Sequence, residues 1–221
     1  VDHGVRLIAD MKFTTAITGL LVGTAGVFAA PVPAPVAVAD PPGIPSATSA
    51  RTLLAGLTVA AAGSTADYDR SLFRHWHIVS GTCDSRETVL VRDGTGVSTD
   101  SACQPTSGTW FSPYDGVTVT QSSSVDIDHM VPLANAWISG ASTWTAARRE
   151  AFANDLSGPQ LWAVSASTNR SKGDRSPDLW SPPVTAFRCT YARSWIQVKS
   201  SYSLTITSAE RTALTSMLNT C

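Results

Sequence analysis

Two short clusters of polar residues in the second half of the chain could carry hydrolytic chemistry. The first runs Asp126-Ile-Asp-His129 and continues as Met-Val-Pro-Leu133. Side chains alternate along a strand, so Asp126 and Asp128 should share a face. Pro132 should end the strand, which would let Asp128 and His129 face one pocket. The carboxylate could bind a hard cation and the imidazole could accept a proton, although such a pair is often only structural.

The second cluster, Asn169-Arg-Ser-Lys-Gly-Asp-Arg175, follows about forty residues later. Asn169 offers a carbonyl oxygen near the start of an expected short helix. Arg170, Lys172 and Arg175 place three cations together, and cations and helix starts both suit phosphate. Alone, this cluster could equally be a solvated basic turn. Together, the two clusters would supply a base, metal ligands and phosphate contacts.

The segment from Asp126 to Pro177 resembles the HNH motif. It has Asp-x-Asp-His-hydrophobic-Val-Pro, then Asn154, then Asn169-Arg-Ser-Lys. The HNH domain of CRISPR effector nucleases is similar, with the same first pattern followed by Asn-Arg-x-Lys. The flanking segments also resemble a family of exported bacterial HNH nucleases, related to the C-terminal nuclease domain of GmrSD-type restriction enzymes. These flanking segments include Cys83-Asp-Ser-Arg86, Ala136-Trp137 and Phe152-Ala-Asn-Asp155.

The resemblance implies a role for each motif residue. His129 would be the base that activates water, and Asp128 and Asn169 would be the protein ligands of one Mg²⁺-class ion, with Mn²⁺ or Ca²⁺ as alternatives. Asn154 would brace the catalytic loop, and Lys172 matches the lysine of the family. Asn169 stands where the named pattern has histidine, which favours an oxygen-liganding metal over zinc.

Several charged residues near these clusters have less certain roles. Phosphate contact by Arg170 or Arg175 is an inference from their charge. Arg86 could contact the transition state or could be a structural ion-pair partner. His75 and His77 stand two residues apart, so they diverge on a helix, and we interpret them as packing and surface residues rather than metal ligands.

The elements expected around these residues form an α+β domain: a ββα-metal (HNH) core with flanking helices and short strands. Spacing predicts helices over residues 53–63, 68–76, 144–152 and 185–198, a short one opening at 168–172, and a last one after a capping box at 207–210. Strands are expected over residues 88–92, near Trp110, over 117–120 and 124–133, and over 159–165.

The N-terminal region should not belong to this domain. Lys12, an apolar run from Phe13 to Ala30 and the small-residue ending Ala37-Val-Ala39 predict a signal peptide, so residues 1–39 are interpreted as upstream sequence and leader. A retained membrane anchor is less favoured because Gly and Pro break the run. Residues 40–48 should be a flexible Pro-rich arm, and residues 49–221 a single domain of a secreted, extracellular protein.

The four cysteines fit an exported chain, in which an even number suggests two disulfides. Cys83–Cys103 and Cys189–Cys221 are the preferred pairs, because each closes a short loop, but four cysteines allow three pairings. The chain has no C-x-x-C, so a structural zinc site is not expected.

These features predict a metal-dependent endonuclease that cuts DNA, with RNA as a further substrate, and has little sequence specificity. It would leave 5′-phosphate and 3′-hydroxyl ends and act as a monomer without membrane attachment. The net charge of −1 neither supports nor excludes nucleic acid as partner. The alternative is an inactive binding domain on the same fold. A zinc peptidase is disfavoured because H-E-x-x-H is missing.

Overall fold

The computed structural model describes residues 1–4 and 40–221. Every helix and strand below lies between Ala47 and Leu218. The predicted signal peptide falls in residues 5–39, outside the described residues. In the described part of the chain, no helix has the length and apolar character needed to cross a bilayer.

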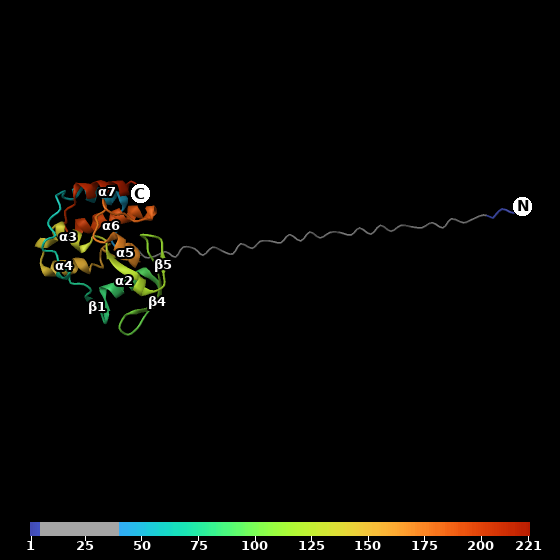
Figure 1. The fold of residues 1–221 in the computed structure, drawn as a ribbon, viewed down its shortest axis with the longest axis horizontal. Coiled ribbons are helices and arrows are strands. Elements are labelled where there is room, and N and C mark those ends of the chain that lie inside the picture. The colour runs from blue at the N-terminus through green and yellow to red at the C-terminus, as the bar shows by residue number, and fades with distance from the viewer. Residues whose placement is uncertain (5–39) are drawn as a thin grey trace. The chain divides into compact units, whose positions relative to one another are not determined.

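The domain mixes helices with three small antiparallel sheets (Figure 1). The helices are α1 (Ala47–Gly56), α2 (Ser85–Asp93), α3 (Leu133–Ile138), α4 (Ala146–Ala153), α5 (Ala166–Lys172), α6 (Arg188–Ser201) and α7 (Ser208–Leu218). The strands are β1 (Ile78–Ser80), β2 (Cys83–Asp84), β3 (Gly94–Thr99), β4 (Pro105–Phe111), β5 (Thr118–Val119), β6 (Val125–His129) and β7 (Leu161–Ser165). Short 3-10 turns are η1 (Arg70–Leu72), η2 (Ser122–Ser124), η3 (Ala141–Thr143) and η4 (Thr185–Phe187). The sequence prediction of an α+β fold is confirmed.

A buried antiparallel pair of strands, β6 and β7, and the short helix after β7 position the two polar clusters. Strands β6 and β7 pair antiparallel, from Val125 opposite Ser165 to His129 opposite Leu161. Almost every residue of the two strands is buried. Helix α5 follows β7 directly, because the Ser165 side chain accepts from the Thr168 amide and caps its first turn. It ends at Gly173, whose φ of 53° favours glycine.

Helices α1, α6 and α7 form the main support of the core. In Figure 1, α6 and α7 lie side by side at one end of the domain, with β1 and β4 at the other. Tyr191 and Trp195 of α6 are completely buried in the main apolar cluster. A disulfide from Cys189 to Cys221 ties the start of α6 to the C-terminus. The disulfide therefore closes the C-terminal helices α6 and α7 covalently on each other.

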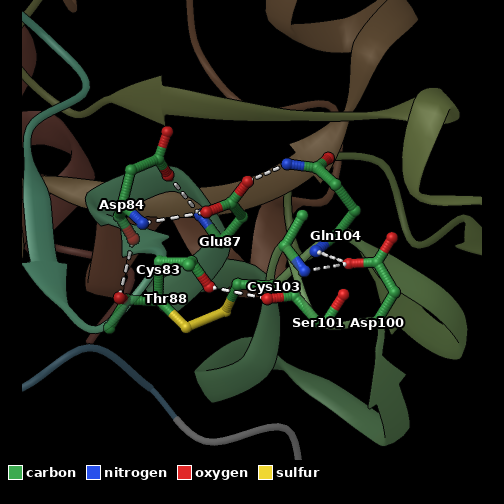
Figure 2. Close-up of a disulfide and its surroundings, with 10 residues drawn as sticks. Cys83, Asp84, Glu87, Thr88, Asp100, Ser101, Cys103 and Gln104 are labelled. Carbon is green, nitrogen blue, oxygen red and sulfur yellow. Dashed lines mark hydrogen bonds between the residues drawn. A yellow bond between two sulfur atoms is a disulfide. The ribbon is translucent and has the colours of Figure 1, made fainter.

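The second disulfide, Cys83–Cys103, joins strand β2, which directly precedes α2, to the turn of the β3–β4 hairpin (Figure 2). Beside it, Asp84 and Glu87 form a reciprocal capping box at the start of α2. Gln104 donates to Glu87, which adds a link between the helix and the hairpin. Both preferred cysteine pairings are thus confirmed.

Three predicted elements differ from the structure. The strand expected over residues 88–92 is part of helix α2, because the capping box starts a helix that buries Val89 and Leu90. The helix expected over residues 68–76 is only the turn η1 within extended chain. Helix α1 ends at Gly56, and Val59 then pairs with Ile206, so the helix expected to Gly63 stops early.

The segment predicted as a flexible arm, residues 40–48, lies on the domain. Pro41 is buried and Ile44 packs against the main apolar cluster. The Pro45 carbonyl accepts from Arg193 Nε at 2.5 Å, and Ser46 caps helix α1. Proline and glycine content signals irregular backbone, but contacts with the rest of the domain decide whether that backbone is held.

Candidate active site

A polar pocket of about 260 Å³ lies where the end of β6 meets α5. It is lined by Arg70, Ile127, Asp128, His129, Pro132, Leu133, Asn169, Arg170, Gly173 and Asp174. Asp128, His129 and Asn169 come from two stretches of sequence about forty residues apart. The structure brings them to one cavity.

His129 is held so that one ring nitrogen remains available as a proton acceptor. Its Nε2 lies 2.9 Å from the Ala153 carbonyl oxygen, which can only accept, so Nε2 carries the proton and Nδ1 carries the lone pair. The Trp76 ring stacks on the imidazole, with centroids 5.3 Å apart and planes 5° apart. Burial lowers the pKa of His129 to about 3, so the ring is neutral near pH 7.

Asp128 is buried between two hydrogen-bond donors. The Tyr114 hydroxyl donates to Oδ2 at 2.6 Å, and Lys172 Nζ donates to Oδ1 at 2.9 Å. Lys172 also donates to the His129 carbonyl at 2.9 Å. Burial raises the pKa of Asp128, although the ammonium of Lys172 opposes that shift. Lys172 thus fixes the end of β6 to the end of α5.

This position corrects the expectation that Lys172 contacts phosphate. Its side chain is 0% exposed, so in this structure its ammonium serves Asp128 and the β6 backbone rather than a ligand. Of the three cations in the second cluster, Arg170 alone lines the pocket. Its side chain is 77% exposed, and its Nε lies 3.9 Å from Asp126.

Asn169 presents its amide at the pocket in a defined orientation. Its Nδ2 donates to Asp126 Oδ2 at 3.1 Å. Among the described residues, Oδ1 has no hydrogen-bond donor, which leaves this oxygen free to accept. Asp126 on β6 thus takes up the amide nitrogen of Asn169 and leaves its carbonyl oxygen available to a ligand.

The oxygen donors of the pocket fit a hard divalent cation. Each carboxylate oxygen of Asp128 accepts one hydrogen bond and keeps a second lone pair, and Asn169 Oδ1 is free. Across residues 1–4 and 40–221, no group of three or more His, Cys, Asp or Glu side chains is arranged to hold a metal. Asp128 and Asn169 could therefore contribute two oxygen ligands, and Asp174, which also lines the pocket, carries a further carboxylate.

Asn154 lies outside the pocket lining, where it fixes the loops behind His129. Its Oδ1 accepts from the Ser85 hydroxyl at 2.6 Å and the His77 amide at 3.1 Å. Its Nδ2 donates to the carbonyls of Arg74 at 2.9 Å and Glu150 at 2.8 Å. These four bonds fix the backbone beside Asn154, including the Ala153 carbonyl that orients the His129 ring. A bracing role of this kind is what the resemblance implies.

Two arginines from the sequence analysis do not line the pocket. Arg86 directs Nη2 at the carbonyls of Ser122 and Val125, 3.4 and 3.3 Å away, where it supports the start of β6. The guanidinium of Arg175 is exposed and bonds the Ser171 carbonyl of its own segment. The structure favours a structural role for Arg86 and gives Arg175 no place at the site.

Three residues around the pocket were missed by sequence reasoning: Arg70, Trp76 and Tyr114. Trp76 and Tyr114 contact the two central side chains, and Arg70 lines the cavity. None stands in a recognisable motif, and Arg70 and Trp76 reach the site from a segment more than fifty residues before Asp128. His77 has the surface role expected of it, 3.5 Å from Glu150, whereas His75 meets His129 edge to face.

Comparisons with known proteins give the chain a family. Residues 100–217, more than half of the chain, match the family described as GmrSD restriction endonucleases, C-terminal domain. A protein of the fungus Arthroderma benhamiae, named "Uncharacterized secreted protein", is 58% identical over 195 residues, which cover 88% of this chain and 94% of that protein. The name of this relative confirms the predicted secreted localisation. No solved structure matches the chain. This chain belongs to the family of the C-terminal domain of GmrSD restriction endonucleases.

Proposed function

We propose that this protein is a secreted, metal-dependent endonuclease that hydrolyses phosphodiester bonds. One observation carries the proposal: a neutral imidazole with an available Nδ1 lines the same pocket as the Asp128 carboxylate and the Asn169 carbonyl oxygen. The sequence order of these groups on two antiparallel strands and the following helix fits a ββα-metal core of the HNH type. Membership of a restriction-endonuclease family supports the same chemistry.

His129 would act as the general base. Its Nδ1 would take a proton from a water molecule, while the Nε2 bond to the Ala153 carbonyl stabilises the imidazolium that forms. Trp76 would keep the ring in one orientation throughout. The attack on phosphorus would displace the 3′ oxygen, which leaves 5′-phosphate and 3′-hydroxyl ends.

Asp128 and Asn169 would hold a Mg²⁺-class ion that supplies positive charge beside the phosphate in the transition state. With two protein oxygens, and with Lys172 already paired to Asp128, we expect weak affinity in the absence of substrate. Substrate phosphate would complete the coordination. Asp128→Asn and Asn169→Ala should therefore raise the metal concentration needed for activity.

The charged lining of the pocket suits recognition of the phosphate backbone of a nucleic acid rather than of its bases. We therefore propose that DNA is cut with little sequence preference and that RNA is a further substrate. A monomer would suffice, since the three central side chains come from one chain.

Digesting plasmid DNA, single-stranded DNA and RNA in parallel tests the proposal, with Mg²⁺, Mn²⁺, Ca²⁺ or EDTA in each series. We expect cleavage with at least one metal, no cleavage in EDTA, and a smear rather than discrete fragments. Nucleic-acid binding without cleavage under any metal would instead support the inactive binding domain. Discrete fragments would contradict the lack of specificity.

A further inference from the structure

A cationic side chain outside the HNH-like motif lines the candidate active site. Arg70 is exposed in the turn η1, about sixty residues before Asp128, and precedes the family match that begins at residue 100. Among the described residues, no carboxylate lies within ion-pair distance of its guanidinium. Arg70 therefore brings to the pocket a positive charge that is not held in an ion pair.

The backbone that carries Arg70 is fixed on both sides. Before it, the Asp69 side chain accepts from the Ser71 amide at 2.8 Å and caps the turn. After it, Phe73 is completely buried and packs against Phe152, with ring centroids 6.1 Å apart. Arg149 also donates to the Leu72 carbonyl at 3.2 Å. A ligand in the pocket would thus meet an anchored arginine rather than a mobile loop.

The charges of the pocket favour an anion close to this side chain. Asp128 is already neutralised by Lys172, and Arg170 lies near Asp126. Asp174 is the remaining acid in the lining. The Arg70 charge also reaches the imidazole, since it is one of the cations that oppose protonation of His129 and lower its pKa. A guanidinium suits the non-bridging oxygens of a phosphodiester, which it can bind with two parallel hydrogen bonds.

We propose that Arg70 is a substrate-binding residue that contacts a phosphate of the nucleic-acid chain held at the pocket. The inference rests on the proposed function and adds a residue that neither the motif nor the family match assigns. Because Arg70 is exposed and contacts the substrate before reaction, its removal should weaken binding about tenfold and raise KM more than it lowers kcat. Arg70→Lys should restore part of the loss, since it keeps the charge but not the fork.

The test measures binding and cleavage separately on the full chain. Binding of a fluorescein-labelled 20-nucleotide single-stranded DNA is followed by fluorescence anisotropy in EDTA across a range of NaCl concentrations. The proteins compared are wild type, Arg70→Ala, Arg70→Lys and the matched control Arg74→Ala, whose exposed side chain does not line the pocket. Cleavage of the same DNA with the active metal gives KM and kcat, and thermal melting checks the fold of each variant.

We expect Arg70→Ala to bind about tenfold more weakly, and its salt dependence, the slope of log K against log [NaCl], to be shallower by about one. Arg74→Ala should match wild type within about twofold in the same assay. Equal binding and equal salt slopes for Arg70→Ala and Arg74→Ala would overturn the inference, while cleavage by wild type would keep the proposed function. If wild type neither binds nor cleaves the DNA, both the inference and the proposed function are overturned. If wild type binds without cleaving, and the binding depends on Arg70, the result supports the inference alone.

Discussion

Two antiparallel strand pairs of this domain are held together in opposite ways. The pair β6–β7 is almost wholly buried, and its end carries Asp128 and His129. The hairpin β3–β4 is mostly exposed, is rich in Ser, Thr and Gly, and is tied to β2 by Cys83–Cys103. One pair relies on packing and the other on a covalent link, as expected where little apolar surface can be buried.

The difference affects the charged groups of the site as well as stability. Burial holds the β6–β7 pair and α5 rigidly, but it also places a carboxylate, an ammonium and an imidazole away from water, which is unfavourable unless they are paired. Lys172, Tyr114 and the Ala153 carbonyl provide the partners. The exposed hairpin carries no such charges and needs no such partners.

The largest effect on stability should follow from breaking the buried pair. Lys172→Met leaves Asp128 buried without its counter-charge, and we expect a loss of about 3–5 kcal/mol in the free energy of unfolding, measured by urea denaturation. Arg170→Met is the matched control, because its exposed contact with Asp126 should contribute less than about 1 kcal/mol. Similar losses for the two variants would show that burial does not distinguish these pairs.

Removing the disulfide of the outer hairpin should have a slightly smaller effect. The paired cysteines are 20 residues apart, so the double variant Cys83→Ser with Cys103→Ser should lose about 3 kcal/mol through the added freedom of the unfolded chain. At temperatures below unfolding, the variant should cut DNA at the wild-type rate. A folded variant that has lost its activity would mean that the outer hairpin contributes to the site.

Acid should destabilise the β6–β7 pair gradually. The pKa of His129 is about 3 in the folded protein and 6.5 in an unfolded chain, so below pH 6.5 the unfolded chain binds a proton that the native ring does not. Stability from this group is therefore lost as pH falls from 6.5 towards 3, at up to about 1.4 kcal/mol per pH unit. Urea midpoints for wild type and His129→Gln from pH 7 to 4.5 measure it. A stability difference between the two proteins that does not change with pH would contradict the buried, neutral ring.

The β6–β7 pair and the region around the β3–β4 hairpin also differ in how far the sequence predicts them. Strands β6 and β7 and helix α5 were located because buried apolar runs are bounded by Pro132, Pro159 and Gly173. Helix α2 was mistaken for a strand because β-branched residues at 88–91 outweighed the capping box that starts it. Local preference was overridden there by the burial of one helix face.

The site itself was predicted in part. The motif pointed to Asp128, His129 and Asn169, which line one pocket, but their chemical roles remain proposals. Trp76 and Arg70 were missed because they reach the pocket across more than fifty residues of chain without local periodicity. Burial of Lys172 was equally invisible, since a lysine in a polar run is usually solvated.

The most direct test of the account is the activity of His129→Ala, with and without added imidazole. In the proposed mechanism this residue supplies the base, so plasmid cleavage should fall at least about a hundredfold. Free imidazole should restore part of it, while His77→Ala, which removes a surface histidine, should cut like wild type. Unchanged cleavage by folded His129→Ala would contradict the central claim that this buried imidazole activates the attacking water.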